Sequence, residues 1–214
     1  MADKFWKNVD VDVQSALGTA QTITNITNAS PGSVVHSGAA VTEGAYLLFS
    51  VTGMTQLDDR VVRADNVEAS PTQFEAEEID TSNFGTFLTG SFQAITFGTS
   101  LTTITGITVS GGEPEFEDTS IIHSDIRTQA PTVTTPFTVS MESKWDPADT
   151  SLVALNSASD QQAARAVRIT FSDNTRVTFY GFVNCTLLPT GAFPGLVRTS
   201  ITFTAIGRNT ALST

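Results

Sequence analysis

The sequence predicts a mainly β protein, a β-sandwich or partial barrel with one short α-helix, to which a small all-β module is added. Apolar and polar residues alternate with a period of two in many segments, whereas the 3.6-residue period of helices is nearly absent. Thr, Ser, Val, Phe and Ile are abundant, and Gly and Pro recur at short intervals, as they do at turns between strands. The 214 residues are enough for one large β domain or two small ones.

Residues 21–91 are expected to form a compact β module of their own. Before this module, three valines alternate with two aspartates and a glutamine over residues 9–14, which predicts a first strand with one buried face. Within the module the expected strands are short, at 46–51, 60–63 and 73–77, and turn signals of Gly, Asn, Asp and Pro separate them. We expect the module to be self-contained and removable.

Residues 1–20 and 92–214 are assigned to a larger domain, because the expected strands there are longer. These strands are 92–98, 104–110, 136–145, 165–172, 176–187 and 196–206. In the last strand apolar and polar side chains alternate from Val197 to Ala205, which indicates a sheet packed on one side only. Asp173 and Asn174 lie between two such runs and suit a tight hairpin, since both residue types tolerate positive φ.

Only one segment has the features of a helix. Asp146 is a suitable N-cap, Pro147 fits a first turn, and Asp149 favours the positive end of the helix dipole. Leu152 and Leu155 are three residues apart and share a helical face. We expect one short helix that ends near residues 156–159.

The charge and the single cysteine restrict the classes of function. The chain has 22 acidic and 11 basic residues, a net charge of −11 that argues against attractive binding to nucleic acid or to an anionic membrane. Residues 21–91 hold nine acidic and two basic residues, so seven of the eleven excess charges lie in the smaller module. Cys185 lies in an alternating apolar stretch, which predicts a buried, inert thiol.

Signals for membrane insertion and for export are also missing. No apolar run approaches the roughly 18 to 20 residues of a membrane span. The first residues lack the apolar stretch of a signal peptide. We therefore expect a protein that folds in a cytoplasm and has no membrane partner.

Motifs for catalysis and metal binding are not found. The chain has no Gly-x-Ser-x-Gly elbow, no Lys-containing phosphate loop and no Cys-x-x-Cys. His36 and His123 lack neighbours at ligand spacing, so we expect structural or solvated histidines. The densest acidic cluster consists of Glu113, Glu115, Glu117 and Asp118. Its spacing is not that of a calcium loop, so a solvated acidic face is the preferred interpretation, and we expect no enzyme, cofactor or metal.

The order of segments after residue 110 resembles the tail tube proteins of siphophages, which have long, non-contractile tails. An acidic Gly-Gly-Glu segment at 111–118 precedes Ile-Ile-His-Ser-Asp-Ile-Arg at 121–127, a Pro-bounded loop at 130–136, and a strand that leads to the expected helix. A hairpin, the turn Leu-Pro-Thr-Gly at 188–191 and a closing strand follow.

The middle of the chain is similar to a small β module found in phage tail proteins. The matching stretches are 29–35, 43–46, 53–57 and 80–85. The sequence departs from the usual pattern at Asp58 and Asp59, where Asn-Gly is expected.

This resemblance implies a structural virion protein, the major subunit of a tail tube. Six subunits would form a ring, and stacked rings would form a tube whose inner wall is a continuous β-barrel around double-stranded DNA, which passes to the host without specific binding. The implied partners are further copies of the chain and the tail tip, tape measure and terminator proteins, with assembly in the bacterial cytoplasm. The small module would decorate the tube exterior.

Two sets of residues are candidates for these roles. Carboxylates on the lumen wall would repel phosphates and leave DNA free to slide, and the candidates are Glu113, Glu115, Glu117, Asp118 and Glu142. Residues 119–135 are too long for a tight hairpin, and a loop at this place in tail tube proteins reaches the adjacent ring. We expect this stretch to be extended in the free subunit and to stack rings through Ser124, Asp125, Arg127, Gln129, Pro131 and Thr134.

The alternative from another class is a host-receptor or carbohydrate-binding β module of a phage tail tip. Exposed Trp and Tyr platforms would be its expected feature. Trp6, Trp145, Tyr46 and Tyr180 are few and scattered along the chain.

Overall fold

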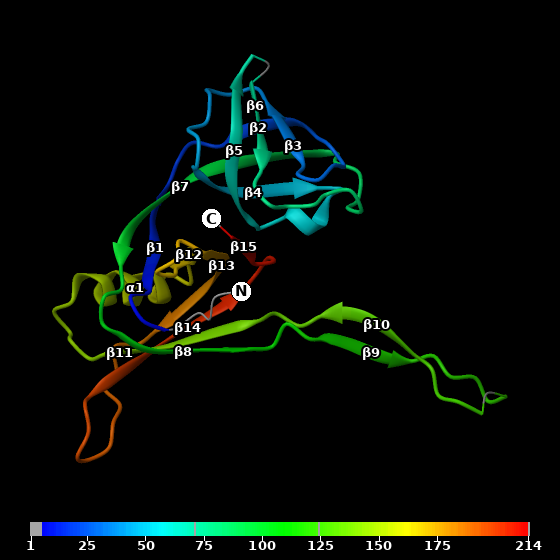
Figure 1. Ribbon diagram of the computed structural model, residues 1–214. Helices are drawn as coiled ribbons and strands as arrows, with labels where there is room; N and C mark the ends of the chain where they lie inside the picture. Colours follow the sequence, from blue (N-terminus) through cyan, green and yellow to red (C-terminus); the bar gives the residue numbers. More distant parts are fainter. Residues whose placement is uncertain (1–5, 71, 124, 214) are drawn as a thin grey trace.

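The computed structural model describes residues 6–70, 72–123 and 125–213, and it confirms the mainly β prediction (Figure 1). In chain order the elements are β1 (Asp10–Leu17), β2 (Gln21–Ile26), β3 (Ser33–His36), β4 (Tyr46–Thr52), the 3-10 helix η1 (Thr55–Leu57), β5 (Val61–Ala69), β6 (Thr72–Ala76), β7 (Thr89–Ser100), β8 (Ile104–Ser110), β9 (Pro114–Asp118), β10 (Gln129–Thr134), β11 (Thr138–Lys144), α1 (Thr150–Asp160), β12 (Ala164–Thr170), β13 (Arg176–Cys185), β14 (Arg198–Ala205) and β15 (Thr210–Leu212).

The smaller part of the molecule is a closed six-stranded barrel. Its strands pair in the order β2-β3-β6-β5-β4-β7, and a pairing between β2 and β7 closes it. The rings of Phe49, Phe74 and Phe92 pack together inside, with centroids 5.5 to 6.3 Å apart. The barrel has its own core. Because the sheet is closed, it has no free strand edge with which another chain could pair.

The larger part is a curled sheet in the order β7-β1-β12-β13-β14-β11-β8, and α1 packs against β13. Its core contains Val11, Leu155, Phe179 and Phe203. Cys185 is buried in the same core, as predicted, and burial raises the pKa of its thiol. The hairpin at Asp173 and Asn174 is also confirmed, with Asn174 at φ 64°.

The barrel and the larger sheet share one strand. Residues from Thr89 to Ala94 of β7 pair with β4 of the barrel, whereas Ile95 and the residues that follow it pair with β1. A buried cluster joins the two parts, with Tyr46, Leu48 and Val61 from the barrel against Ala166 and Leu212 from the larger part. The barrel therefore extends a few residues beyond position 91 and shares a core with its neighbour.

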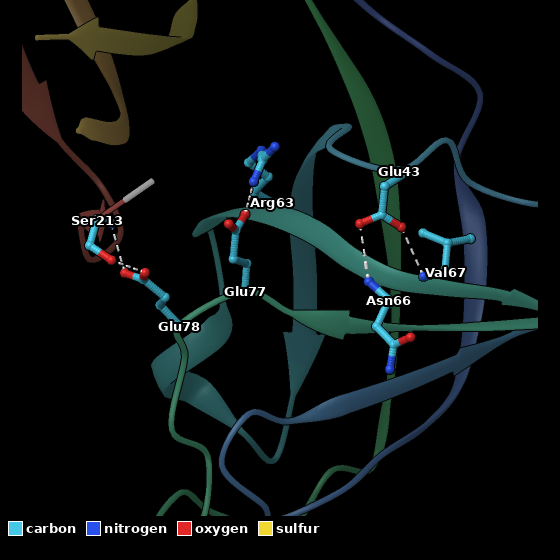
Figure 2. Close-up of polar contacts among 7 residues, drawn as sticks. All are labelled: Glu43, Arg63, Asn66, Val67, Glu77, Glu78 and Ser213. Atoms are coloured by element: carbon cyan, nitrogen blue, oxygen red, sulfur yellow. Dashed lines mark hydrogen bonds and ion pairs between the residues drawn. The ribbon is translucent and has the colours of Figure 1, made fainter. Parts of the chain in front are cut away.

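Residues near the end of the chain also form hydrogen bonds with the barrel. The hydroxyl of Thr210 donates to the Val61 carbonyl at 2.7 Å and accepts from Nε of Arg60 at 2.9 Å. Next to it, the Ser213 amide donates to a carboxylate oxygen of Glu78 at 2.8 Å, and the Ser213 hydroxyl bonds to the other oxygen (Figure 2). Burial and the nearby Arg208 lower the pKa of Arg60 to about 10.

Two further carboxylates hold the barrel strands together (Figure 2). Glu77 forms an ion pair with Arg63 of β5. Glu43 accepts from the amides of Asn66 and Val67 at 3.2 and 3.0 Å, where the pairing of β5 with β6 is interrupted. These acidic residues of the barrel thus have structural contacts.

The helix begins later than the sequence predicted. Its N-cap is Asp149, whose carboxylate accepts from the Ser151 amide at 2.8 Å. Asp146 instead accepts from the Ala148 amide and closes a turn before the helix, so the prediction of Asp146 as the cap and Pro147 in the first turn was wrong. Both aspartates are good caps by type, and packing decides between them because Leu152 must enter the core from the first turn.

Candidate assembly surfaces

A two-stranded arm, residues 113–135, projects from the larger sheet (Figure 1). It continues the pairing of β8 with β11 and consists of β9 paired with β10. The chain enters it through Gly111 and Gly112, which have φ of +80° and +83°. A Cβ at Gly111 would lie 2.6 Å from the Pro136 carbonyl oxygen, so only glycine fits there.

The arm exposes large apolar side chains. These are Phe116, Ile121, Ile122, Ile126 and Val133, and Ile122 is 96% exposed. None of them belongs to a core cluster of the described residues. Exposed apolar residues gathered on one projecting segment make the arm a candidate interface.

The acidic candidates from the sequence fall in two places. Glu113, Glu115, Glu117 and Asp118 lie on the arm, at or just before β9, and all are exposed. The hydroxyl and the amide of Ser120 donate to the Asp118 carboxylate and lower its pKa. Glu142 lies elsewhere, on β11 of the large sheet. The fold therefore separates Glu142 from the other four.

The candidates for ring stacking lie along the same arm. Gln129, Pro131 and Thr134 belong to β10, where they pair with Asp118, Phe116 and Pro114. Asp125 and Arg127 lie in the connection between β9 and β10, and Ser124 lies outside the described residues. Of the expected extended stretch, residues 129–134 are extended as β10 and pair with β9, whereas the described residues between the two strands include turns and bends.

The large sheet has an open polar face over β8, β11 and β14. Thr138, Ser140, Glu142 and Lys144 of β11 alternate with side chains that are buried in the core. Their neighbours across the sheet are Thr108 and Ser110 on β8, and Arg198, Ser200, Thr202 and Thr204 on β14. Arg198 pairs with Glu142 at 2.6 Å. The face is therefore rich in hydroxyl groups.

A second exposed apolar surface is the loop of residues 186–197 between β13 and β14, which we call the apolar loop. It has no charged residue, and it exposes Leu188, Phe193, Leu196 and Val197. The sequence prediction placed residues 186–187 and 196–197 in strands and residues 188–191 in a turn, whereas β13 ends at Cys185 and β14 begins at Arg198. The signal that was missed is a run of large apolar residues inside an uncharged segment with two prolines and two glycines.

The larger sheet ends in two strand edges that no described strand covers. β8 is the last strand on one side, and the second half of β7 pairs only with β1. A cavity of about 370 Å³ separates β8 from the segment around Trp6 and Val11. Uncovered strand edges are sites for pairing with another chain.

The described residues contain few groups placed for metal binding or catalysis. Among them, no three His, Cys, Asp or Glu side chains are placed to hold a metal ion. His36 is buried against Phe74 and Phe92, where burial lowers its pKa, and His123 is exposed. No helix in the described part of the chain is long and apolar enough to cross a bilayer.

A comparison with known proteins places the chain in a family. Residues 52–214 match the model of a family described as phage tail tube protein. No curated protein matches the chain significantly. Because the family model covers the shared strand β7, every other strand of the large sheet except β1, the arm and the apolar loop, more than half of the sequence, the chain belongs to the phage tail tube protein family.

Proposed function

We propose that this protein is the major tail tube subunit of a siphophage and that it polymerises into stacked hexameric rings through which double-stranded DNA passes into the host. The single observation that carries the proposal is the projecting arm with its exposed apolar residues, in a chain of the tail tube family. The number six follows from the resemblance of the chain to siphophage subunits. Neither catalysis nor a cofactor has a part in this function.

The sheet edges supply a route to ring closure. In the proposed ring, the uncovered edge of β8 in one subunit pairs with an uncovered edge of its neighbour, such as the second half of β7. Repetition of this pairing around the ring removes every free edge, as closure does in a barrel.

The open polar face of β8, β11 and β14 is proposed as the lumen wall. Its hydroxyl groups are uncharged, and Glu142 is paired with Arg198, so the wall has no cluster of free cations that would hold phosphates. The other candidates, Glu113, Glu115, Glu117 and Asp118, would add negative charge where the arm crosses a ring junction. The lumen would thus let DNA slide.

The small barrel is proposed to lie on the tube exterior, rigidly joined to the wall. Its acidic surface and closed sheet leave no edge for ring contacts. The remaining partners proposed are the tail tip, tape measure and terminator proteins, with assembly in the bacterial cytoplasm before the subunit enters the virion.

Removal of the arm tests the function. A deletion of residues 113–135 joins Gly112 to Pro136 and leaves a four-residue connection between the paired ends of β8 and β11, Ser110 and Thr138. No core cluster loses a member, so the variant should unfold at the same temperature as the unmodified protein.

In negative-stain electron microscopy, the unmodified protein should form hollow tubes of stacked six-membered rings at high concentration. The arm deletion should give no tubes. Compact monomers of the unmodified protein at every concentration, with or without a tail-assembly initiator, would exclude the function. Normal tubes from the deletion variant would show that the arm is not the ring contact.

A further inference from the structure

The arm and the apolar loop lie at opposite ends of one sheet (Figure 1). At one end of β11, Thr138 pairs with Ser110, directly beside the base of the arm. At the other end, Lys144 pairs with Arg198, and the Trp145 amide donates to the Val197 carbonyl beside the loop. Seven strand residues separate the two ends, a span of roughly 20 Å at about 3.4 Å per residue.

The apolar loop has a defined shape. The amides and carbonyls of Thr190 and Arg198 exchange two hydrogen bonds, at 2.7 and 2.8 Å. The indole of Trp145 donates from Nε1 to the Leu187 carbonyl at 2.8 Å. These bonds fix the start and the end of the loop, while Phe193 between them is 98% exposed. A shallow cavity of about 360 Å³ lies beside Phe193, lined by Pro189, Gly191 and Val197 among others.

The charges of the arm and of the apolar loop indicate which surface binds the loop. The arm carries five acidic residues and one basic residue, a net charge of −4, so two arms laid together would repel each other. The apolar loop has no charge and is flanked by Lys144 and Arg198. An arm therefore meets no repulsion from the loop itself, and its exposed isoleucines find an apolar partner.

We propose that the apolar loop is the acceptor for the arm of a second copy of this chain, so that the arm of one subunit docks on residues 186–197 of a subunit in the next ring. This inference rests on the proposed function and names the partner surface within it. Because the two surfaces differ and lie at opposite ends, the contact is heterologous and repeats without closing. Such a contact gives the stack a direction. Unpaired arms remain at one end of the stack, and unpaired loops remain at the other end.

Two point variants separate the surfaces. Phe193→Asp should block the loop, and Ile122→Asp should block the arm, while both side chains are so exposed that folding should be unaffected. Leu88→Asp is the matched control, since Leu88 is an exposed apolar residue outside the arm and the loop. Far-ultraviolet circular dichroism verifies the fold of all three.

Polymerisation is then followed by light scattering and electron microscopy. The Phe193→Asp and Ile122→Asp proteins should each need about 30-fold more protein to polymerise, which is the effect of losing a central interface side chain. Leu88→Asp should polymerise like the unmodified protein. Mixing the two blocked variants should restore one junction, because the Phe193→Asp arm is intact and the Ile122→Asp loop is intact. The mixture should contain particles with twice the mass of those formed by either variant alone. It should contain no larger particles.

The outcomes separate the inference from the function on which it rests. If unmodified protein forms tubes and Phe193→Asp forms them equally well, the loop is not the acceptor, although the tube function stands. If mixing gives no association beyond that of each variant alone, the arm and the loop do not meet, and the inference is overturned. If unmodified protein forms no tubes, the function and the inference fail together.

Discussion

The guanidinium of Arg168 donates to a carboxylate oxygen of Asp12 at 2.7 Å and lies over the ring of Phe97, 4.6 Å from its centroid. The ring of Tyr46 lies 5.2 Å from the same guanidinium carbon. These side chains come from β12, β1, β7 and β4, so one cation contacts both the large sheet and the barrel. Arg168 is therefore central to the junction between the two parts.

Replacement of Arg168 by Ala should destabilise the protein by about 1 to 3 kcal/mol, because it removes a partly buried ion pair and two ring contacts. Chemical denaturation measures the change. The matched control is Arg198→Ala, which removes the exposed pair with Glu142 and should cost less than about 1 kcal/mol. Equal costs for the two variants would show that the Arg168 contacts do not hold the junction.

The hydroxyl of Thr210 offers a second test of the junction. Thr210→Val should cost about 1 to 3 kcal/mol, because the Val61 carbonyl and Nε of Arg60 would lose a buried partner. Thr199→Val is the control, since the buried Thr199 hydroxyl makes no hydrogen bond within the described residues. Its replacement should be neutral or stabilising in the same denaturation assay. A neutral Thr210→Val would mean that the C-terminal strand does not fasten the barrel.

Two substitutions test which aspartate caps the helix, Asp149 as in the structure or Asp146 as the sequence predicted. Asp149→Ala should lower the free energy of unfolding by about 1 kcal/mol, as loss of an N-cap does. Asp146→Ala, which removes only an exposed turn contact, should change it by less than about 0.5 kcal/mol. The reverse order of effects in thermal unfolding would restore Asp146 as the cap.

The buried His36 predicts a dependence of stability on pH. Burial lowers its pKa below the ordinary histidine value of 6.5, so the folded state binds a proton less readily than the unfolded chain. Its contribution to stability is complete above about pH 6.5 and is lost as the pH falls toward the lower pKa of the folded state.

In melting curves between pH 7 and pH 5, His36→Leu should therefore show a smaller fall of Tm than the unmodified protein. His123→Leu should leave the fall unchanged, because His123 is exposed. A His36→Leu protein with the same loss of Tm would assign the acid sensitivity to other groups.

Removal of the barrel has a different expectation in the light of the structure. A deletion of residues 21–91 would uncover Ala166 and Leu212, together with Phe97 and Tyr180 that pack against them. We expect an aggregated product in size-exclusion chromatography, although the flanking strands remain. A soluble and assembling deletion variant would show instead that the shared cluster is dispensable.

The sequence by itself determined most of the long strands and the face of each that is buried, although β2, β3, β10 and β15 were not among the predicted strands. Alternation predicted 104–110 and 196–206, and the structure has β8 at Ile104–Ser110 and β14 at Arg198–Ala205. The hairpin at Asp173 and Asn174 was also predicted, because it depends on residues that are adjacent in the chain. The resemblance to tail tube proteins likewise rested on the order of local segments.

Only the tertiary structure decided which strands pair and where the side chains meet. Closure of the barrel joins β2 to β7, and Glu142 is separated from the acidic residues of the arm, although all five lie within thirty residues. A periodic pattern shows which face of a strand is apolar but not which partner covers it. Pairing depends on contacts between segments that are distant in sequence, and these form only when the whole core is packed.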